Sequence, residues 1–409
     1  MEELTLEHFY AQSLGLAAPW RVAGVVIDGE RKEVRIRVEC APGEAWADPD
    51  TGERAEIKDW QERTWRHLDT CEYQTVIHAR VPRVILSCGR SLTVRVPWAE
   101  PGGRFTKRFE SRVIALVEAC RTVRGAARLA RLTDDQVDGV LQRAVARGLL
   151  RRTDQPLRYI GIDEKAIGKG HRYMTILNDL EGSRVIAVVP ERTQAAAAAL
   201  LRELPAALRT NIEAVALDMW PAYISAVSEV LPAADIVFDR FHIKKHLNEA
   251  VDKVRRQEHR ELSAAGNLLL KGSKYLWLKT HEDMRTKAAR EFRALLVQDL
   301  QTGTAWALKE NLDKLWNYRQ WGRAVRFLDA WREAALTTGL RPLEKAADLI
   351  GRHAAGILNY IFHRITNAAS EGINSTIQSL KAAARGLPSF QNFRTRILFF
   401  LGKLDLHPA

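Results

Sequence analysis

The stretch Tyr159-Ile160-Gly161-Ile162-Asp163-Glu164 decides the fold that we expect, because it is a short, strand-like apolar run that delivers a carboxylate at its end. A second apolar run, Ala214-Val215-Ala216-Leu217, is followed directly by Asp218. A later segment with a helical pattern supplies Glu371. Three carboxylates presented by two strands and a helix predict a divalent-metal site for phosphoryl transfer.

The residues around the first two acids alternate between strand and helix patterns. Apolar runs predict strands that end at Asp163 and that span 172–178, 185–189, 214–217 and 236–238, with helices over 194–208 and 221–230. Three antiparallel strands, a helix, and then alternating strands and helices are the order of the α/β RNase H-like, or retroviral-integrase-like, fold. The first and fourth strands of that fold are neighbours. We therefore expect Asp163 and Asp218 to face each other in a core that begins with residues 156–240.

Each acid also has a simpler structural interpretation. Aspartates at strand ends are common turn residues, Asp218 is placed to cap the helix that begins near Pro221, and Glu371 could be an ordinary surface glutamate. The joint arrangement is more informative, because two Mg²⁺ ions need several converging oxygen ligands. Asp239 competes with Asp218 as the second acid. We treat it as a supporting residue, and the other supporting candidates are His242, Asn367 and Asn374.

Residues 241–362 have a helical pattern without an intervening strand, and this predicts a helical domain inserted into the core. Its tryptophans are expected in the core rather than on a DNA-stacking surface; they are Trp277, Trp306, Trp316, Trp321 and Trp331. The core then resumes over residues 363–409 with the helix that carries Glu371.

Residues 104–152 predict three helices, over 109–120, 123–129 and from a cap at Thr133 to Leu149, with the short turn of a helix-turn-helix domain. The segment holds twelve Lys or Arg against five acids. The residues expected to contact DNA are Arg124, Arg128, Gln142, Arg143 and Arg147, the last three on the recognition helix. The alternative is a helical bundle with a solvated basic face.

Residues 1–100 predict an irregular, β-rich module. Strands are expected at 25–27 and 34–38, joined by a turn at Asp28-Gly29, and a second pair at 81–86 and 92–97. Cys40 and Cys88 follow strands, as zinc ligands often do, but neither belongs to a Cys-x-x-Cys pair. Two alternatives therefore stay open, a zinc site or buried thiols.

The length, composition and net charge of the chain favour a nucleic-acid partner. The chain has 409 residues, a formal net charge of +12 and 46% hydrophobic residues, and its pI is about 9.6. Such a balance favours a polyanion, although a merely basic globular protein would share it. No apolar run is long enough to cross a membrane, and the acidic N-terminus does not resemble a signal peptide, so we expect a cytoplasmic, nucleoid-associated protein.

Four motifs together resemble the DDE transposases of bacterial insertion sequences, most closely the ISL-three family. They are Gly161-Ile162-Asp163-Glu164, Ala216-Leu217-Asp218-Met219-Trp220-Pro221-Ala222-Tyr223, Phe238-Asp239-Arg240-Phe241-His242 and Thr366-Asn367-Ala368-Ala369-Ser370-Glu371-Gly372-Ile373-Asn374-Ser375. The resemblance implies that Asp163, Asp218 and Glu371 bind two Mg²⁺ ions, which Mn²⁺ could replace. It also implies an N-terminal zinc module, from which the chain departs because Gly43 stands where a cysteine is expected.

The function that we expect is Mg²⁺-dependent cleavage and strand transfer at terminal inverted repeats in double-stranded DNA. Two ends must be joined, so at least a homodimer is expected on DNA. A catalytically silent or domesticated DNA-binding regulator on the same fold is the alternative. A structure-specific nuclease, such as a junction resolvase, is a third possibility.

Overall fold

A computed structural model describes the chain from residue 5 to residue 409, except for residues 45, 48–50, 87, 153–155, 169–171, 281–283, 285, 367 and 385–388. The chain divides into two compact units. The first comprises Met1–Arg152 with Leu380–Ala409, and the second comprises Thr153–Ser379. None of the described helices combines the length and the apolar character that a membrane crossing requires.

The second unit contains a five-stranded sheet. Its strands are β7 (Tyr159–Ala166), β8 (Tyr173–Asp179), β9 (Arg184–Pro190), β10 (Ala214–Leu217) and β11 (Asp235–Phe238). They lie in the order β11-β10-β7-β8-β9, with β7, β8 and β9 antiparallel and β10 parallel to both β7 and β11. The expected strand order and the contact between the first and fourth strands are confirmed. β7 continues along β8 to Ala166, so Asp163 lies inside the strand rather than at its end.

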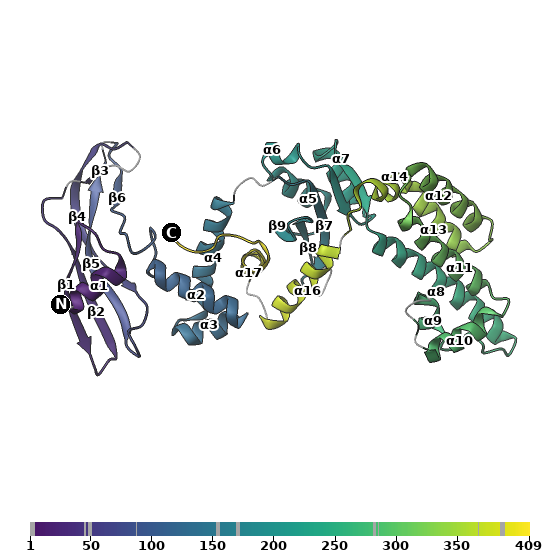
Figure 1. Ribbon diagram of the computed structural model, residues 1–409, viewed down its shortest axis with the longest axis horizontal. Helices are drawn as coiled ribbons and strands as arrows, with labels where there is room; N and C mark the ends of the chain where they lie inside the picture. Colours follow the sequence, from purple (N-terminus) through teal and green to yellow (C-terminus); the bar gives the residue numbers. More distant parts are fainter. Residues whose placement is uncertain are drawn as a thin grey trace. The chain divides into compact units, whose positions relative to one another are not determined.

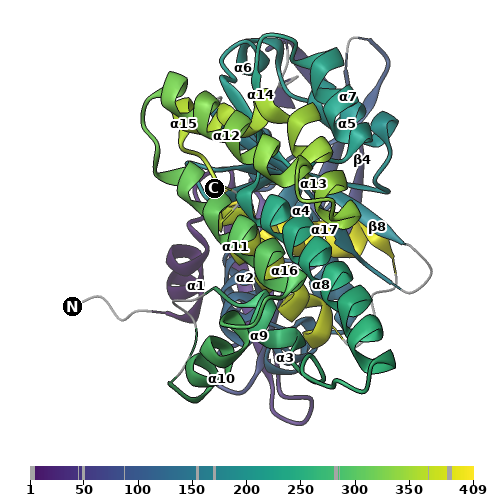
Figure 2. The same ribbon diagram turned by 90° about the vertical axis from the view of Figure 1, so that its right-hand side faces the viewer.

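Three helices follow the antiparallel strands or connect the parallel ones, α5 (Gln194–Arg202), α6 (Ala206–Arg209) and α7 (Pro221–Val230). The single helix predicted over 194–208 is divided in two, because Pro205 stands between α5 and α6 and cannot donate a backbone hydrogen bond. α5 and α7 pack side by side (Figures 1 and 2). Their buried side chains share a core cluster with one face of the sheet, which includes Ile160, Ile162, Val215 and Leu217.

The described residues of the predicted insertion form helices joined by turns and loops, without a strand. Its elements are α8 (Arg240–Ala264), α9 (Lys274–Leu278), α10 (Thr286–Leu296), α11 (Gln301–Leu312), the 3-10 helix η2 (Asp313–Asn317), α12 (Trp321–Leu336), α13 (Arg341–Arg352), α14 (Ala354–Leu358) and α15 (Tyr360–His363). α8 runs from the sheet to α9 and packs beside α11 and α13 (Figures 1 and 2). Trp277 and Trp331 are buried, and the other three tryptophans are half-buried against core clusters, as predicted.

The first unit contains a six-stranded sheet. Its strands are β1 (Trp20–Asp28), β2 (Glu33–Cys40), β3 (Trp46–Ala47), β4 (Arg54–Arg66), β5 (Gln74–Ile85) and β6 (Ser91–Thr93). The predicted β1–β2 hairpin and β5–β6 pair are present, although β6 ends at Thr93 instead of residue 97. The sequence prediction missed the helix α1 (Leu6–Leu14) and the strand β4. β4 was missed because most of its side chains are polar and exposed.

Three helices form the predicted helix-turn-helix, α2 (Lys107–Cys120), α3 (Val123–Ala130) and α4 (Asp134–Arg151). The turn between α3 and α4 places Arg131 at φ 53°, and Thr133 forms a capping box with Gln136 at the start of α4. Both features end one helix and begin the next within three residues, which is the geometry that this domain needs.

The helix α16 (Ala368–Ala383) and the helix α17 (Phe390–Leu401) complete the chain. The predicted domain 363–409 is not one piece, because the division between the units falls after Ser379. α17 packs against α4, where Arg396 contacts the Asp138 carboxylate at 3.3 Å. The C-terminal residues thus belong with the helix-turn-helix rather than with the core.

Candidate active site and DNA-binding surface

Asp163, Asp218 and Asp239 lie at the same level of three adjacent strands. The β7–β10 register pairs Gly161 with Ala216, and two more residues along both strands reach Asp163 and Asp218. The β10–β11 register pairs Leu217 with Phe238, so Asp218 and Asp239 are the next residues on each strand. Parallel neighbours are about 4.8 Å apart, which brings the backbones of these acids close together.

The alternation of side chains places all three aspartates on one face of the sheet. Ala214, Ala216 and Val237 belong to a small cluster on that face, and the residues between them belong to the cluster shared with α5 and α7. Each aspartate follows this small-residue face by an even number of positions. The acids therefore point away from α5 and α7.

The helix α16 faces the same side of the sheet. Asn374 Nδ2 donates a hydrogen bond of 2.6 Å to Asp163 Oδ2, and Asn178 Nδ2 donates one of 3.0 Å to Ser370 Oγ. Glu371 stands three residues before Asn374, so the two share a helical face, and its side chain is exposed. Glu371 and Asp239 line one cavity of about 430 Å³. Asn367, a predicted supporting residue, lies outside the described residues.

Burial and mutual repulsion raise the pKa values of the acids. Burial raises the pKa of Asp163, and its hydrogen bonds with the Glu164 backbone and with Asn374 only partly oppose this. Burial also raises the pKa of Asp218. Burial, with the Asp218 and Asp163 charges, raises the pKa of Glu164 to about 7. Burial is thus the main cause of the raised pKa values, and repulsion between the carboxylates adds to it at Asp163 and Glu164.

His242 stands beside this cluster, at the start of α8. Its Nδ1 lies 3.3 Å from Asp239 Oδ2, at ion-pair distance but without hydrogen-bond alignment. The contact with Asp239 raises the pKa of His242, and the Asp218 and Asp163 charges add to the effect. Asp239 also accepts a hydrogen bond from the Phe241 amide, which caps α8. Asp239 thus serves both the helix and the site.

The donor set fits Mg²⁺. Carboxylates and an amide oxygen are the ligands that this ion prefers, and Asn374 Oδ1 is buried without a hydrogen-bond partner among the described residues. Within the same residues, no three His, Cys, Asp or Glu side chains already stand at metal-binding distances. Mg²⁺ usually binds one or two protein carboxylates and keeps several waters, so Asp163 and Asp218 provide enough carboxylate ligands for one ion.

Two cations near the acids were not predicted from the sequence. Arg192 lies 3.9 Å from Glu164, and its guanidinium is 4.1 Å from the Tyr173 ring centroid and 4.8 Å from that of Trp220. Its charge and that of Lys245 lower the pKa of Asp218. Arg192 follows the third strand and Lys245 lies in α8, so no local motif connects either residue to the acids.

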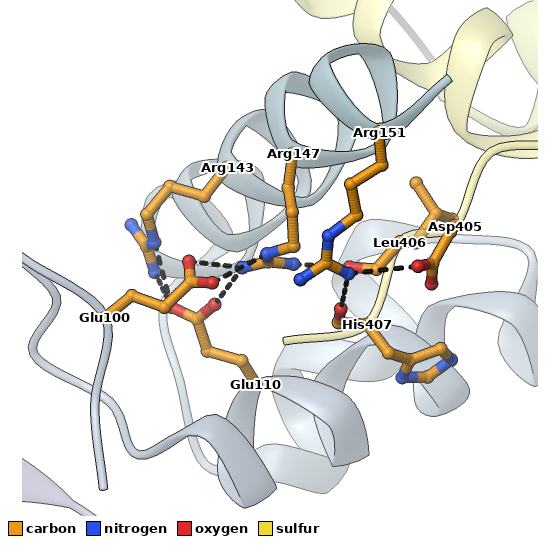
Figure 3. A network of polar contacts seen from close by, with 8 residues as sticks. All are labelled: Glu100, Glu110, Arg143, Arg147, Arg151, Asp405, Leu406 and His407. Atoms are coloured by element: carbon orange, nitrogen blue, oxygen red, sulfur yellow. Dashed lines mark hydrogen bonds and ion pairs between the residues drawn. The ribbon is translucent and has the colours of Figure 1, made fainter. Parts of the chain in front are cut away.

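The helix-turn-helix exposes only part of the predicted DNA-binding set. Arg124 and Arg128 on α3 and Gln142 on α4 are exposed. On the described part of α4, the arginines instead take part in contacts inside the first unit (Figure 3). Of the arginines predicted to contact DNA, the exposed ones therefore lie on α3.

The prediction that Arg147 contacts DNA is wrong. Its guanidinium is buried, donates to both carboxylate oxygens of Glu100 at 2.8 and 2.6 Å, and bonds Glu110 and the Leu406 carbonyl (Figure 3). Arg143 is half-buried and bonds Glu110 Oε1 at 2.8 Å through Nε. Arg143 is thereby held against α2, and Arg147 joins the helix-turn-helix to the C-terminal segment.

The predicted zinc candidates are not brought together. The β2–β5 register, continued from Val38 and Ala79, sets Cys40 beside Val81, whereas Cys88 follows the end of β5 at Ile85. Four residues of strand span about 13 Å, and two zinc-bound sulfurs must lie within about 5 Å. All four cysteines are free thiols.

Three family models match the chain. One described as a transposase matches residues 160–397, one for the helix-turn-helix domain of transposase family ISL3 matches 94–145, and one for the zinc-finger of transposase IS204/IS1001/IS1096/IS1165 matches 44–88. The last match indicates a related module, although the described residues do not assemble a zinc site.

Two relatives support the same assignment. The transposase for insertion sequence element IS1001 of Bordetella parapertussis is 31% identical over 346 residues, which cover 83% of each chain. The transposase for IS1557 of Mycobacterium tuberculosis strain H37Rv is 26% identical over 354 residues, covering 80% of this chain and 79% of that one.

These findings define the class of the protein. It is a transposase of an insertion sequence, and it carries a DNA-binding helix-turn-helix domain. Within that class, the chain belongs to the ISL3 family, which confirms the family resemblance of its motifs.

Proposed function

We propose that this transposase cleaves and joins DNA with an RNase H-like core in which Asp163, Asp218 and Glu371 hold two Mg²⁺ ions. One observation carries the proposal: Asp163 and Asp218 lie level on adjacent parallel strands, with raised pKa values, and face the helix that bears Glu371. The Asp218 charge adds to the raised pKa of Asp163, and bound divalent cations would relieve that repulsion.

The residues of the chain orient the acids. Asp163 accepts bonds from Asn374 and from the Glu164 amide, and Asp218 accepts one from the Trp220 amide at 3.0 Å. Each carboxylate is thus fixed in direction. Each Asp163 oxygen accepts one of these bonds and keeps a second lone pair for a ligand, and the bond to Asp218 uses only its Oδ1. When bound, the metal ions would activate the attacking hydroxyl and stabilise the oxygen that leaves. Arg192 and Lys245 would attract the DNA phosphates.

The reaction balances without a covalent protein intermediate. Water adds to the phosphorus of a phosphodiester, the 3′ oxygen leaves and takes a proton, and the products are a 3′-OH and a 5′-phosphate. The 3′-OH then attacks a phosphodiester of the target strand, a new P–O bond forms, and the 3′ oxygen of the target strand leaves and takes the proton of the attacking hydroxyl. The substrate is double-stranded DNA with the terminal inverted repeats of the element, and a homodimer or larger assembly would bring two ends together.

A nicking assay tests this function. The substrate is a supercoiled plasmid that carries the DNA flanking the coding region on both sides, with Mg²⁺ or with EDTA. We expect the wild-type protein to nick it in Mg²⁺ only, and Asp163→Asn, Asp218→Asn and Glu371→Gln each to lower the rate at least 100-fold with unchanged binding. Binding without nicking by the wild type would instead indicate a regulator, and cutting independent of the flanking sequence would indicate a structure-specific nuclease.

A further inference from the structure

Two adjoining cavities follow the exposed side of α8, away from its packed face. The first contains Asp239 and Glu371. The second, of about 550 Å³, lies between α8 and α9. Phe241 and Lys244 line both cavities, so the second opens directly beside the candidate active site.

The second cavity is basic along its length. Five Lys or Arg line it against two acids; the cations are Lys244, Lys245, Lys253, Arg256 and Lys274. Lys244 bonds Asp313 at 2.9 Å, and Arg256 lies 3.2 Å from Asp252. Lys245, Lys253 and Lys274 are exposed. They form no ion pair within the described part of the chain, so their charges are available to a polyanion.

The row of α8 residues that lines the second cavity has the length of a short nucleic-acid strand. The lining residues of α8 recur every three or four positions from Phe241 to Arg256, which is about 22 Å at 1.5 Å per residue. That length equals about six steps of a DNA strand at 3.4 Å each. The cavity volume is typical of a pocket for one small ligand, so it suits single nucleotides better than a duplex.

Phe241 is an exposed aromatic ring at the junction of the two cavities. It lies two residues after Asp239 and is 56% exposed, although a phenylalanine gains free energy when it is buried. Aromatic rings set among cations are the surfaces on which unpaired bases stack, because every base has a π face. The ring therefore stands where the DNA strand would pass from the acids to the lysines.

We propose that the second cavity, called the α8 groove below, binds the DNA strand next to the cleaved phosphodiester. We also propose that Phe241 stacks on an unpaired base of that strand. The proposal rests on the proposed function for the identity of the strand. It adds a site for unpaired DNA in the helical insertion, which would hold the end of the duplex open beside the acids.

Binding of single-stranded DNA tests the site without cleavage. The full chain carrying Asp163→Asn is titrated into a fluorescein-labelled 16-nucleotide oligothymidylate, and anisotropy is recorded. Phe241→Ala should weaken binding roughly 5- to 100-fold, and Phe241→Trp should keep it, because a base stacks on either ring. The matched control is Phe362→Ala, which removes a ring that is 64% exposed on α15 and lines neither cavity. It should leave binding unchanged.

A second experiment locates the strand. The same oligonucleotide with 5-iododeoxyuridine at its centre is irradiated with the full chain, and the crosslinked peptide is identified by mass spectrometry. The expected crosslink is at Phe241. Crosslinks that all fall outside α8 and α9, or equal affinities of the Asp163→Asn chain with and without Phe241→Ala, would overturn the proposal. Either result can occur while the plasmid is still nicked in Mg²⁺, so failure of this site and failure of the proposed function are distinguishable.

Discussion

Asn374 donates a hydrogen bond of 2.6 Å to Asp163 across 211 positions of the chain. The bond ties α16 to the sheet at the acid itself, and it fixes the helical turn on which Glu371 stands. The side-chain oxygen of Asn374, Oδ1, is also buried, and it has no hydrogen-bond partner in the described residues. Asn374 is therefore the residue that joins the two parts of the candidate site.

Removing this bond should slow cleavage more than it weakens DNA binding. Asn374→Ala is expected to lower kcat of plasmid nicking by about tenfold or more, because a hydrogen bond to a charged group contributes roughly 1.5–3 kcal/mol. The matched control is Ser375→Ala, which alters an exposed side chain on the same helix. Equal rates for Asn374→Ala and the wild type would show that the bond does not position the site.

Substitutions of Arg147 and Arg124 should change different properties: the first should lower the stability of the first unit, and the second should weaken DNA binding. Arg147→Ala leaves the buried Glu110 carboxylate with one cation fewer and should destabilise the first unit by about 3 kcal/mol. Arg124→Ala removes an exposed cation of α3, so it should keep stability while reducing the salt dependence of DNA binding by about one phosphate contact. Denaturant unfolding and binding titrations at several salt concentrations measure both. An unchanged stability of Arg147→Ala would contradict its structural role.

Two glycines of α4 should respond in opposite directions to alanine. A Cβ at Gly148 would meet Leu404 Cβ at 2.6 Å and the Asp405 carbonyl at 3.2 Å, so Gly148→Ala should detach the C-terminal segment and destabilise the unit. A Cβ at Gly139 would meet only the Arg143 side chain, at 3.7 Å. Gly139→Ala should therefore stabilise the helix by about 0.5–1 kcal/mol. Limited proteolysis of the C-terminal segment compares them, and equal cleavage of both variants would refute the close packing.

Burial of His67 should make the first unit less stable in acid. Burial, with the charges of Arg108 and Arg66, lowers the pKa of His67 to about 4, while an unfolded histidine titrates near 6.5. Between these values the unfolded chain binds a proton that the folded chain does not. The contribution is complete above pH 6.5 and is lost as the pH falls toward 4, by at most on the order of 3 kcal/mol.

The variant His67→Gln tests this pH dependence. It should flatten the stability change between pH 6.5 and 4.5, measured by amide hydrogen exchange in β5. An unchanged slope would mean that other groups cause the acid sensitivity. The Thr106 hydroxyl lies 2.9 Å from His67 Nδ1, and glutamine offers a polar group to the same partner.

The sequence predicted the core sheet well, because β7, β10 and β11 are buried apolar runs whose ends are marked by acids. It predicted the helix-turn-helix for a similar reason, since Thr133 and Gln136 form a local capping box. The sequence could not predict the role of Arg147, because its partners Glu100 and Leu406 lie 47 and 259 positions away along the chain. An arginine on a recognition helix looks the same in sequence whether it meets a phosphate or a buried glutamate.

The sequence contained no pattern that predicts the position of Arg192 beside Glu164 either. It approaches Glu164 because β8 and the N-terminus of α7 bring the rings of Tyr173 and Trp220 against its guanidinium. The cavity beside Phe241 likewise depends on where α9 packs against α8. Contacts between distant elements decide these features, and no local pattern of residues encodes them.

The most direct test of the central claim is a change of metal preference at Asp163. A thiolate is a softer ligand than a carboxylate and favours Mn²⁺ over Mg²⁺. If Asp163 contacts the metal, Asp163→Cys should lose plasmid nicking in Mg²⁺ and regain a measurable part of it in Mn²⁺, while the wild type is active in both. Wild-type activity of Asp163→Cys in Mg²⁺, or no recovery in Mn²⁺ by a folded variant, would contradict a direct metal contact at Asp163.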